Sequence, residues 1–131
     1  MDNNVIELYQ KYIPSLFRYM VKKGCTCMPY PKVILNNKKQ EGIFIKTGYF
    51  DPNNNSITLF INGRHPKDVL RSFAHECIHY KQQMDGDIAK SGYSGDKITE
   101  DKNLIKLEEE AYLKGNMCFR SWTEDMQRKG N

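Results

Sequence analysis

The sequence predicts an α+β fold in a single domain spanning residues 1–131, and three observations support this. A chain of 131 residues can bury one hydrophobic core but not two. Apolar residues recur at helical spacing in three segments, whereas residues 29–63 are rich in β-branched and aromatic side chains. The expected order is therefore an N-terminal helix, three strands, a second helix, a loop and a C-terminal helix.

The first helix is expected over residues 4–22. Apolar side chains from Val5 to Met20 return every three or four positions and give the helix one apolar face. Pro14 lies inside this segment and should kink or split it. A cationic last turn followed by Gly24 is typical of a helix end.

Three short strands are expected next, over residues 32–35, 43–50 and 56–61. The segments between them are rich in residues that form turns, and they are too short to hold crossover helices. Consecutive strands should therefore pair side by side as a three-stranded antiparallel meander.

The second helix is expected over residues 66–84, because Pro66 precedes apolar residues with the spacing of one buried face. Residues 85–98 contain three glycines and form a connection of the length at which loops are often functional or disordered. Helical spacing returns from residue 98 to about residue 115 and continues towards residue 128.

The second helix carries His75-Glu76-Cys77-Ile78-His79, which has the pattern H-E-x-x-H. Residues four apart lie one above the other on a helix, so the two imidazoles can reach the same metal ion. Glu76 would flank that ion and take a proton from a water molecule that the metal activates. Zinc lowers the pKa of such a water from about 15.7 to about 7, which is the chemistry of peptide hydrolysis.

A catalytic zinc site takes three protein ligands, and the adjacent Glu108, Glu109 and Glu110 are candidates for the third. On a helix, Glu108 falls in the centre of the apolar face, Glu109 near its edge and Glu110 between lysines. A carboxylate on an apolar face is costly unless a cation meets it, so Glu108 is the predicted ligand. The other two should be solvated and paired with lysines. Glu109 and Asp85 remain open as alternatives to Glu108.

These residues make the chain resemble a minimal zincin metallopeptidase of the gluzincin kind, as found in bacteria and bacteriophages. The resemblance covers the expected strand 56–61, the motif helix and the segment from Glu108 to Ala111. It implies that the two histidines and a glutamate from a later helix bind zinc, with Glu76 as the general base. It also implies that strand 56–61 is an edge strand that holds the substrate backbone.

The chain departs from a longer zincin pattern that continues to a third histidine. Gln82 stands in the place of the glycine of that pattern, and Asp85 in the place of the histidine ligand. His65 is expected in a loop or helix cap, and Cys77 in the core. The residue that stabilises the transition-state oxyanion is left open among Tyr80, Tyr93, Tyr112 and Arg120.

Composition limits the setting in which the chain works. The formal charge of +4 is too small by itself to indicate nucleic-acid binding. No run approaches the roughly 18 apolar residues that a membrane span needs, and the N-terminus lacks the pattern of a signal peptide. We therefore expect a cytoplasmic, intracellular or viral location, without membrane partners and with reduced cysteines at positions 25, 27, 77 and 118.

The sequence thus predicts a zinc metallopeptidase, a hydrolase with Zn²⁺ as cofactor and a peptide or protein as substrate. The alternative is a zinc-stabilised binding or structural module, such as a phage or regulatory component, that hydrolyses nothing. Nucleic-acid binding is a third hypothesis and rests only on the small basic excess. The substrate, the cleavage preference and the oligomeric state do not follow from the sequence.

Overall fold

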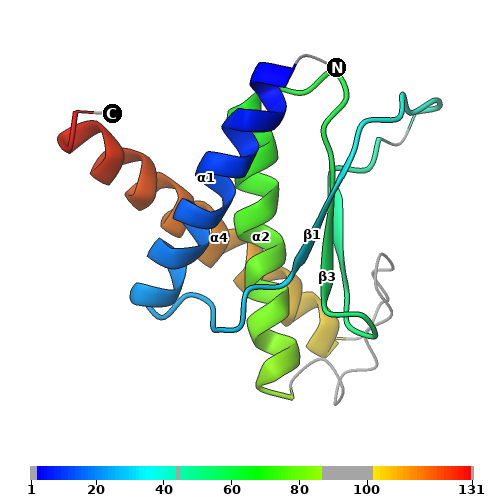
Figure 1. Cartoon of the computed structure of the whole chain (residues 1–131). Coiled ribbons are helices and arrows are strands. Elements are labelled where there is room, and N and C mark those ends of the chain that lie inside the picture. Colours follow the sequence, from blue (N-terminus) through cyan, green and yellow to red (C-terminus); the bar gives the residue numbers. More distant parts are fainter. Residues whose placement is uncertain (1–2, 44, 87–101, 131) are drawn as a thin grey trace.

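A computed structural model describes residues 3–43, 45–86 and 102–130 of the chain. These residues form an α+β fold, as predicted, with three helices and a three-stranded sheet (Figure 1). Most of the predicted loop 85–98, and the expected helix start at residues 98–101, lie outside the described residues. In chain order the elements are α1 (Asn3–Lys22), β1 (Lys32–Asn36), β2 (Gly48–Asp51), β3 (Ser56–Phe60), α2 (Pro66–Met84) and α4 (Lys102–Arg128).

The sheet is mixed, so the predicted antiparallel meander is wrong in its first pairing. Strand order is β1-β3-β2, with β1 parallel to β3 and β2 antiparallel to it. The described residues of the connection 37–47 form no helix, yet β2 lies two strand positions from β1, and β3 occupies the position between them. The first four residues of β3 are buried, as expected for a central strand. Strand 56–61 is therefore not the edge strand that the zincin resemblance implies.

Strand β2 is shorter than predicted and begins only at Gly48. Ile43 and Ile45, which suggested a strand over residues 43–50, are 91% and 52% exposed. The backbone N–H and C=O of Lys46 pair with the side-chain amide of Gln40, at 2.9 and 2.8 Å, in place of another strand. Ile43 and Ile45 thus lie in a loop and not in a strand.

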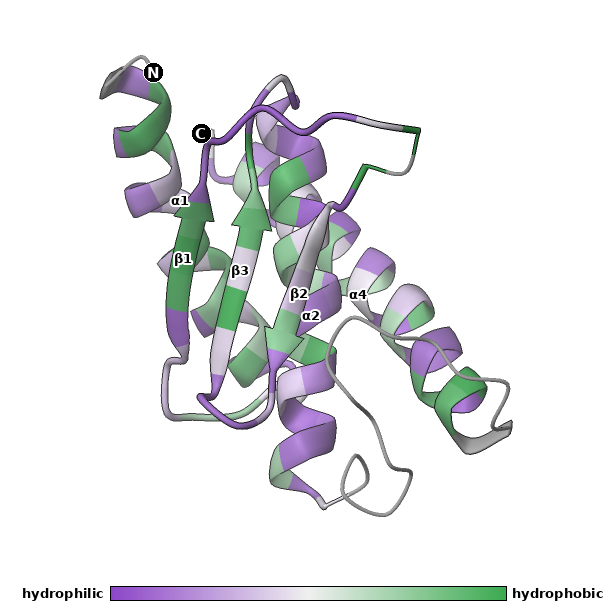
Figure 2. Cartoon of the chain, turned by 90° about the vertical axis from the view of Figure 1, so that its right-hand side faces the viewer, coloured by the Kyte–Doolittle hydropathy of each residue, from purple (hydrophilic) through white to green (hydrophobic). Residues whose placement is uncertain are grey.

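The helices form a layer on one side of the sheet (Figures 1 and 2). Helix α2 lies against β2 and β3, while α1 and α4 pack on α2. Helix α1 continues through Pro14 without splitting, because its apolar face is buried both before the proline, at Tyr9, and after it, at Phe17. No helix in the described residues combines the length and apolarity that crossing a bilayer requires.

A disulfide joins Cys25, just after α1, to Cys118 on α4. The expectation that all four cysteines are reduced is therefore wrong for this pair, whereas Cys27 and Cys77 are free thiols. The bonded cysteines lie 93 residues apart in sequence, so only the packing of the helices brings them together. Cys77 is buried in the core, as predicted, and burial raises the pKa of its thiol well above the usual value.

Replacing both Cys25 and Cys118 by serine should lower the free energy of unfolding by about 2–4 kcal/mol, because this cross-link restricts the unfolded chain strongly. Urea unfolding followed by circular dichroism, without reductant, measures the difference. The control is Cys27→Ser, which removes a free, partly exposed thiol and should change little. Equal stability of the double variant and the wild type would contradict this.

Candidate metal centre

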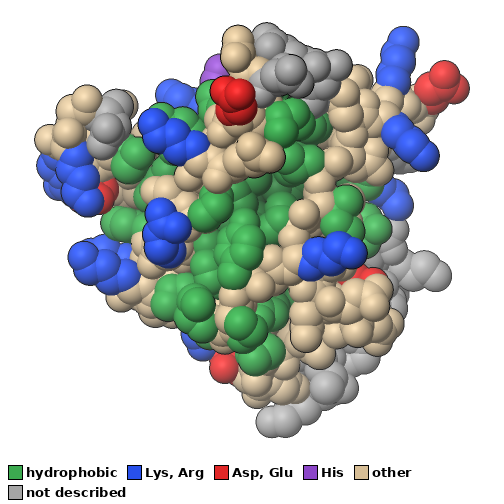
Figure 3. Space-filling model, viewed as in Figure 1, with side chains coloured by type: hydrophobic (Ala, Val, Ile, Leu, Met, Phe, Trp, Pro, Cys, Tyr) green, Lys and Arg blue, Asp and Glu red, His purple; other side chains and the backbone are tan. Residues whose placement is uncertain are grey.

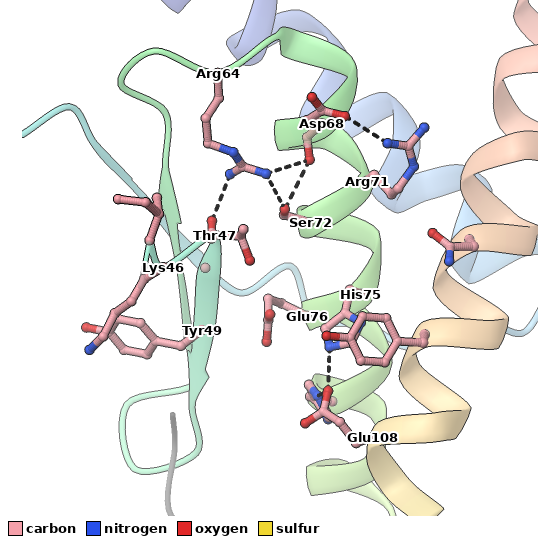
Figure 4. Close-up of a pocket in the computed structure, with 15 residues that line it drawn as sticks. Lys46, Thr47, Tyr49, Arg64, Asp68, Arg71, Ser72, His75, Glu76 and Glu108 are labelled. Atoms are coloured by element: carbon pink, nitrogen blue, oxygen red, sulfur yellow. Dashed lines mark hydrogen bonds and ion pairs between the residues drawn. The ribbon is translucent and has the colours of Figure 1, made fainter. Parts of the chain in front are cut away.

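His75 lies on the side of α2 that faces α4 (Figure 4), and His79 lies one turn further along the helix, where it also contacts α4 through Glu108. Their ring centroids are 4.9 Å apart, and the rings meet edge to face. His79 is only 1% exposed, whereas His75 is partly exposed. The spacing of four residues therefore places the imidazoles together, as the sequence predicts.

Helix α4 brings Glu108 to both rings. Its Oε1 lies 2.6 Å from Nε2 of His75 and 3.0 Å from Nε2 of His79. One ligand atom from each of these three residues falls within 4.8 Å of the others, so the group could hold a metal ion. Glu109 is exposed, and Asp85 pairs with Lys81 at the end of α2, so neither alternative joins this group.

The charge state of Glu108 suits a metal ligand. Burial acts to raise its pKa, but hydrogen bonds from His75 and His79 outweigh burial and lower the pKa to about 2. Glu108 is therefore a carboxylate at neutral pH. A cation placed between the three groups would take over the part that the imidazole N–H groups now play.

Gly115 allows α4 to approach α2 closely enough for this contact. A Cβ atom at this position would lie 3.0 Å from Cα of His75 and 3.1 Å from its backbone nitrogen. Glu108 precedes Gly115 by two helical turns and so lies on the same face of α4. The contact between backbones at Gly115 thus sets the distance at which Glu108 meets the histidines.

Gln82 links His79 to α4 and was not predicted as a site residue. Nδ1 of His79 donates to Oε1 of Gln82 at 2.8 Å, and Nε2 of Gln82 donates to Leu107 O at 3.0 Å and to Glu110 Oε1 at 2.9 Å. With its proton on Nδ1, His79 can present Nε2 to a metal. Glu110 also pairs with Lys114, as predicted, although it is not simply solvated.

Glu76 lies on the other side of the histidines, towards β2 (Figure 4). It is 5% exposed, and its carboxylate accepts a hydrogen bond from the backbone N–H of Phe50. Burial raises its pKa above the ordinary glutamate value, more than the neighbouring histidines lower it. A carboxylate with a raised pKa is suited to accept a proton near neutral pH.

A cleft of about 650 Å³ runs between β2 and α4, along α2. His75, Glu76, His79 and Glu108 all line it. The strand at this cleft is β2, an edge strand, and not the segment 56–61 that the resemblance indicated. In the antiparallel ladder the N–H and C=O of Gly48 point away from β3, towards the open edge.

Arg64 holds the start of β2 next to α2 and was also missed. Its Nη1 donates to Thr47 O at 2.9 Å and Phe60 O at 2.8 Å, and its Nη2 donates to Asp68 O at 3.0 Å and Ser72 Oγ at 2.7 Å. One guanidinium therefore fixes the width of the cleft between strand and helix. No spacing rule in the sequence indicates such a contact.

Among the proposed oxyanion donors that the structure describes, only Tyr112 lines the cleft. Its ring centroid lies 4.3 Å from that of His75. Tyr80 is buried and donates to Pro29 O, while Arg120 pairs with Glu124 on α4. Tyr93 lies outside the described residues. His65 caps α2, as predicted, by accepting from Lys67 N.

No family model, curated protein or solved structure matches the chain. The resemblance to zincins remains a prediction that is based on the H-E-x-x-H motif. The geometry supports the coarser statement that His75, His79 and Glu108 form a group able to hold a metal ion.

Gln82→Leu should weaken metal binding by about 10- to 100-fold, because Nδ1 of His79 loses the acceptor that orients the ring. Competition between the protein and a chromophoric zinc chelator measures the affinity. Gln83→Leu is the matched control, since Gln83 is the neighbouring residue and does not bond the histidine. Equal affinities of the two variants would remove Gln82 from the site.

Gly115→Ala should push α4 away from α2 and lower the free energy of unfolding by about 1–3 kcal/mol, although alanine favours helices over glycine. Zinc affinity should fall as well, because Glu108 moves with the helix. Thermal unfolding and chelator competition test the two effects. Ser121→Ala, at an exposed position of α4, controls for the helix propensity of alanine and should leave both unchanged.

Proposed function

We propose that the chain is a zinc-dependent peptidase of the zincin kind. His75, His79 and Glu108 would bind Zn²⁺, and Glu76 would act as the general base. One observation carries this proposal: three metal-ligand atoms converge within 4.8 Å, beside a buried carboxylate that lines the same cleft. It also agrees with the H-E-x-x-H pattern, in which the glutamate follows the first ligand.

The donor set favours zinc. Two imidazole nitrogens and one carboxylate oxygen are ligands of catalytic zinc sites, which keep a fourth position for water or substrate. Calcium and magnesium prefer sites made of oxygen atoms. When bound, zinc supplies a Lewis acid that polarises the substrate carbonyl and lowers the pKa of water.

Glu76 would accept and then donate the proton that moves during the reaction. Its raised pKa and its place on the β2 side of the histidines suit a group that accepts a proton from the attacking water. The same carboxyl group can then give this proton to the departing amine, so it ends the cycle ionised again. The hydrogen bond from Phe50 N–H would hold it in place throughout.

The shape of the cleft suits an extended polypeptide. The outer edge of β2 offers the N–H and C=O of Gly48 to a substrate backbone, which would add to the sheet as a further strand. The clamp by Arg64 keeps this edge at a fixed distance from α2. Tyr112, on the opposite wall, is the candidate donor to the oxyanion.

The decisive experiment is hydrolysis of a denatured protein mixture by the zinc-loaded chain, compared with its Glu76→Gln variant. We expect the variant to keep bound zinc and to lose activity by about 100- to 10,000-fold, because it retains the ligands but lacks the base. Elemental analysis gives the metal content, and mass spectrometry follows the peptides. Glu109→Gln makes the same chemical change at an exposed neighbour of Glu108 and should remain active.

The outcomes separate the proposal from its alternatives. Bound zinc without turnover in the wild type would favour the zinc-stabilised binding or structural module. A protein that binds no zinc, and whose stability is the same in the His75→Ala variant, would contradict both. Iron in place of zinc would indicate a different reaction class, since two histidines and a carboxylate also bind iron.

A further inference from the structure

The positive charge of the chain is concentrated in one part of the fold. Residues 3–39, which include α1 and β1, contain seven lysines and arginines and a single acid, Glu7. The whole chain has 20 basic and 16 acidic residues, so the remainder has 13 basic and 15 acidic ones. The segment with α1 and β1 therefore carries a formal charge of +6, while the rest of the chain, with the metal centre, carries −2.

Hydrophobic side chains are exposed on the same part of the surface. Met28, Tyr30 and Ile34 are 61%, 43% and 38% exposed, and Val33 and Leu35 of β1 are only partly buried. Figure 3 shows hydrophobic side chains gathered in the middle of the face that α1 and β1 form, with Lys and Arg side chains around them. We call this surface the α1–β1 face.

Strand β1 is an edge strand of the sheet and has no strand on its outer side among the described residues. Among the elements of the described residues, the backbone of β1 lies close only to that of β3, while the side chains of Val33 and Leu35 pack against the core. Lys32 N–H donates to Asn55 O, and Asn36 O accepts from Ile61 N–H, so these residues direct their backbone groups towards β3. Neighbouring residues in a strand point the opposite way, so Val33 and Leu35 direct their N–H and C=O groups to the outer edge.

We propose that the α1–β1 face binds an acidic, extended segment of a partner protein, which adds to β1 as a fourth strand. The outer edge provides two N–H and two C=O groups for its backbone. Apolar side chains of the segment would lie against Val33, Leu35 and Tyr30. Its carboxylates would meet the surrounding lysines and arginines.

Other occupants fit these features less well. A second copy of the chain would bring a charge of +6 against +6. Phosphates of a nucleic acid are acceptors only and could not pair with the carbonyl groups of the edge. A lipid surface would leave both kinds of backbone group without partners. Because β1 and β2 are opposite edges of the sheet, the segment would leave the metal cleft accessible.

The test uses a fluorescent peptide of alternating glutamate and valine, and follows its binding to the full chain by anisotropy. We expect saturable binding that weakens by about tenfold between about 50 and 300 mM salt, and no binding of the peptide with lysine in place of glutamate. Lys32→Glu should weaken binding by about fivefold. The matched control, Lys106→Glu on α4, should not. Mass spectrometry confirms that the peptide stays intact.

Two further measurements test the strand addition itself. Val33→Pro removes an outward N–H, leaves the ladder to β3 intact, and should weaken binding by about tenfold. In the wild type, peptide should slow hydrogen exchange at the amides of Val33 and Leu35, whereas the Ile34 amide, which faces β3, should be slow already.

Three results would overturn the proposal. One is the absence of saturable binding by the glutamate peptide. Another is unchanged exchange at Val33 and Leu35 when peptide is bound. The third is tighter binding of duplex DNA or of anionic vesicles, with no effect of Val33→Pro, which would make the face a general site for polyanions or lipid.

Discussion

The close contact between α2 and α4 at Gly115 is the constraint on which the site depends. Neither helix holds the whole group that could bind a metal ion, because one carries both histidines and the other carries the carboxylate. Glu108 has a short side chain, so it reaches both rings only where the helix backbones nearly touch. Gln82 adds a second link between the same helices, through the ring nitrogen of His79 that does not face the metal position. The close packing of α2 and α4 therefore also brings the candidate metal-binding side chains together.

Those parts of the site that follow from the geometry of a single helix could be predicted from the sequence. The positions of His75 and His79 follow from the rise and turn of a helix, and Glu108 from its place on the apolar face of another. Gln82 could not be recognised in this way, because its role depends on which carbonyl and carboxylate of α4 come next to it. The same holds for the disulfide of Cys25, since neither spacing nor composition shows which helices will lie together.

The order of the strands in the sheet could not be predicted from the sequence either. Alternation of apolar residues locates a strand, but it does not say which strand will be its neighbour. Ile43 and Ile45 have the residue type of a strand, yet they lie in a loop because no neighbour is available there. The central position of β3 leaves the sheet with two open edges of different character. One borders the cleft that the candidate metal group lines, and the other lies in the most basic part of the molecule.

The disulfide has a consequence for how α4 is held. Cys118 follows Gly115 by three residues, so the covalent bond and the tightest helix contact anchor the same stretch of α4. The turns before this stretch carry Glu108, and polar contacts to His75 and Gln82 join them to α2 in addition to the apolar packing of Leu107 and Ala111. Helix α4 is thus fixed covalently near Cys118, and an ion bound by His75, His79 and Glu108 would join its N-terminal half to α2 as well.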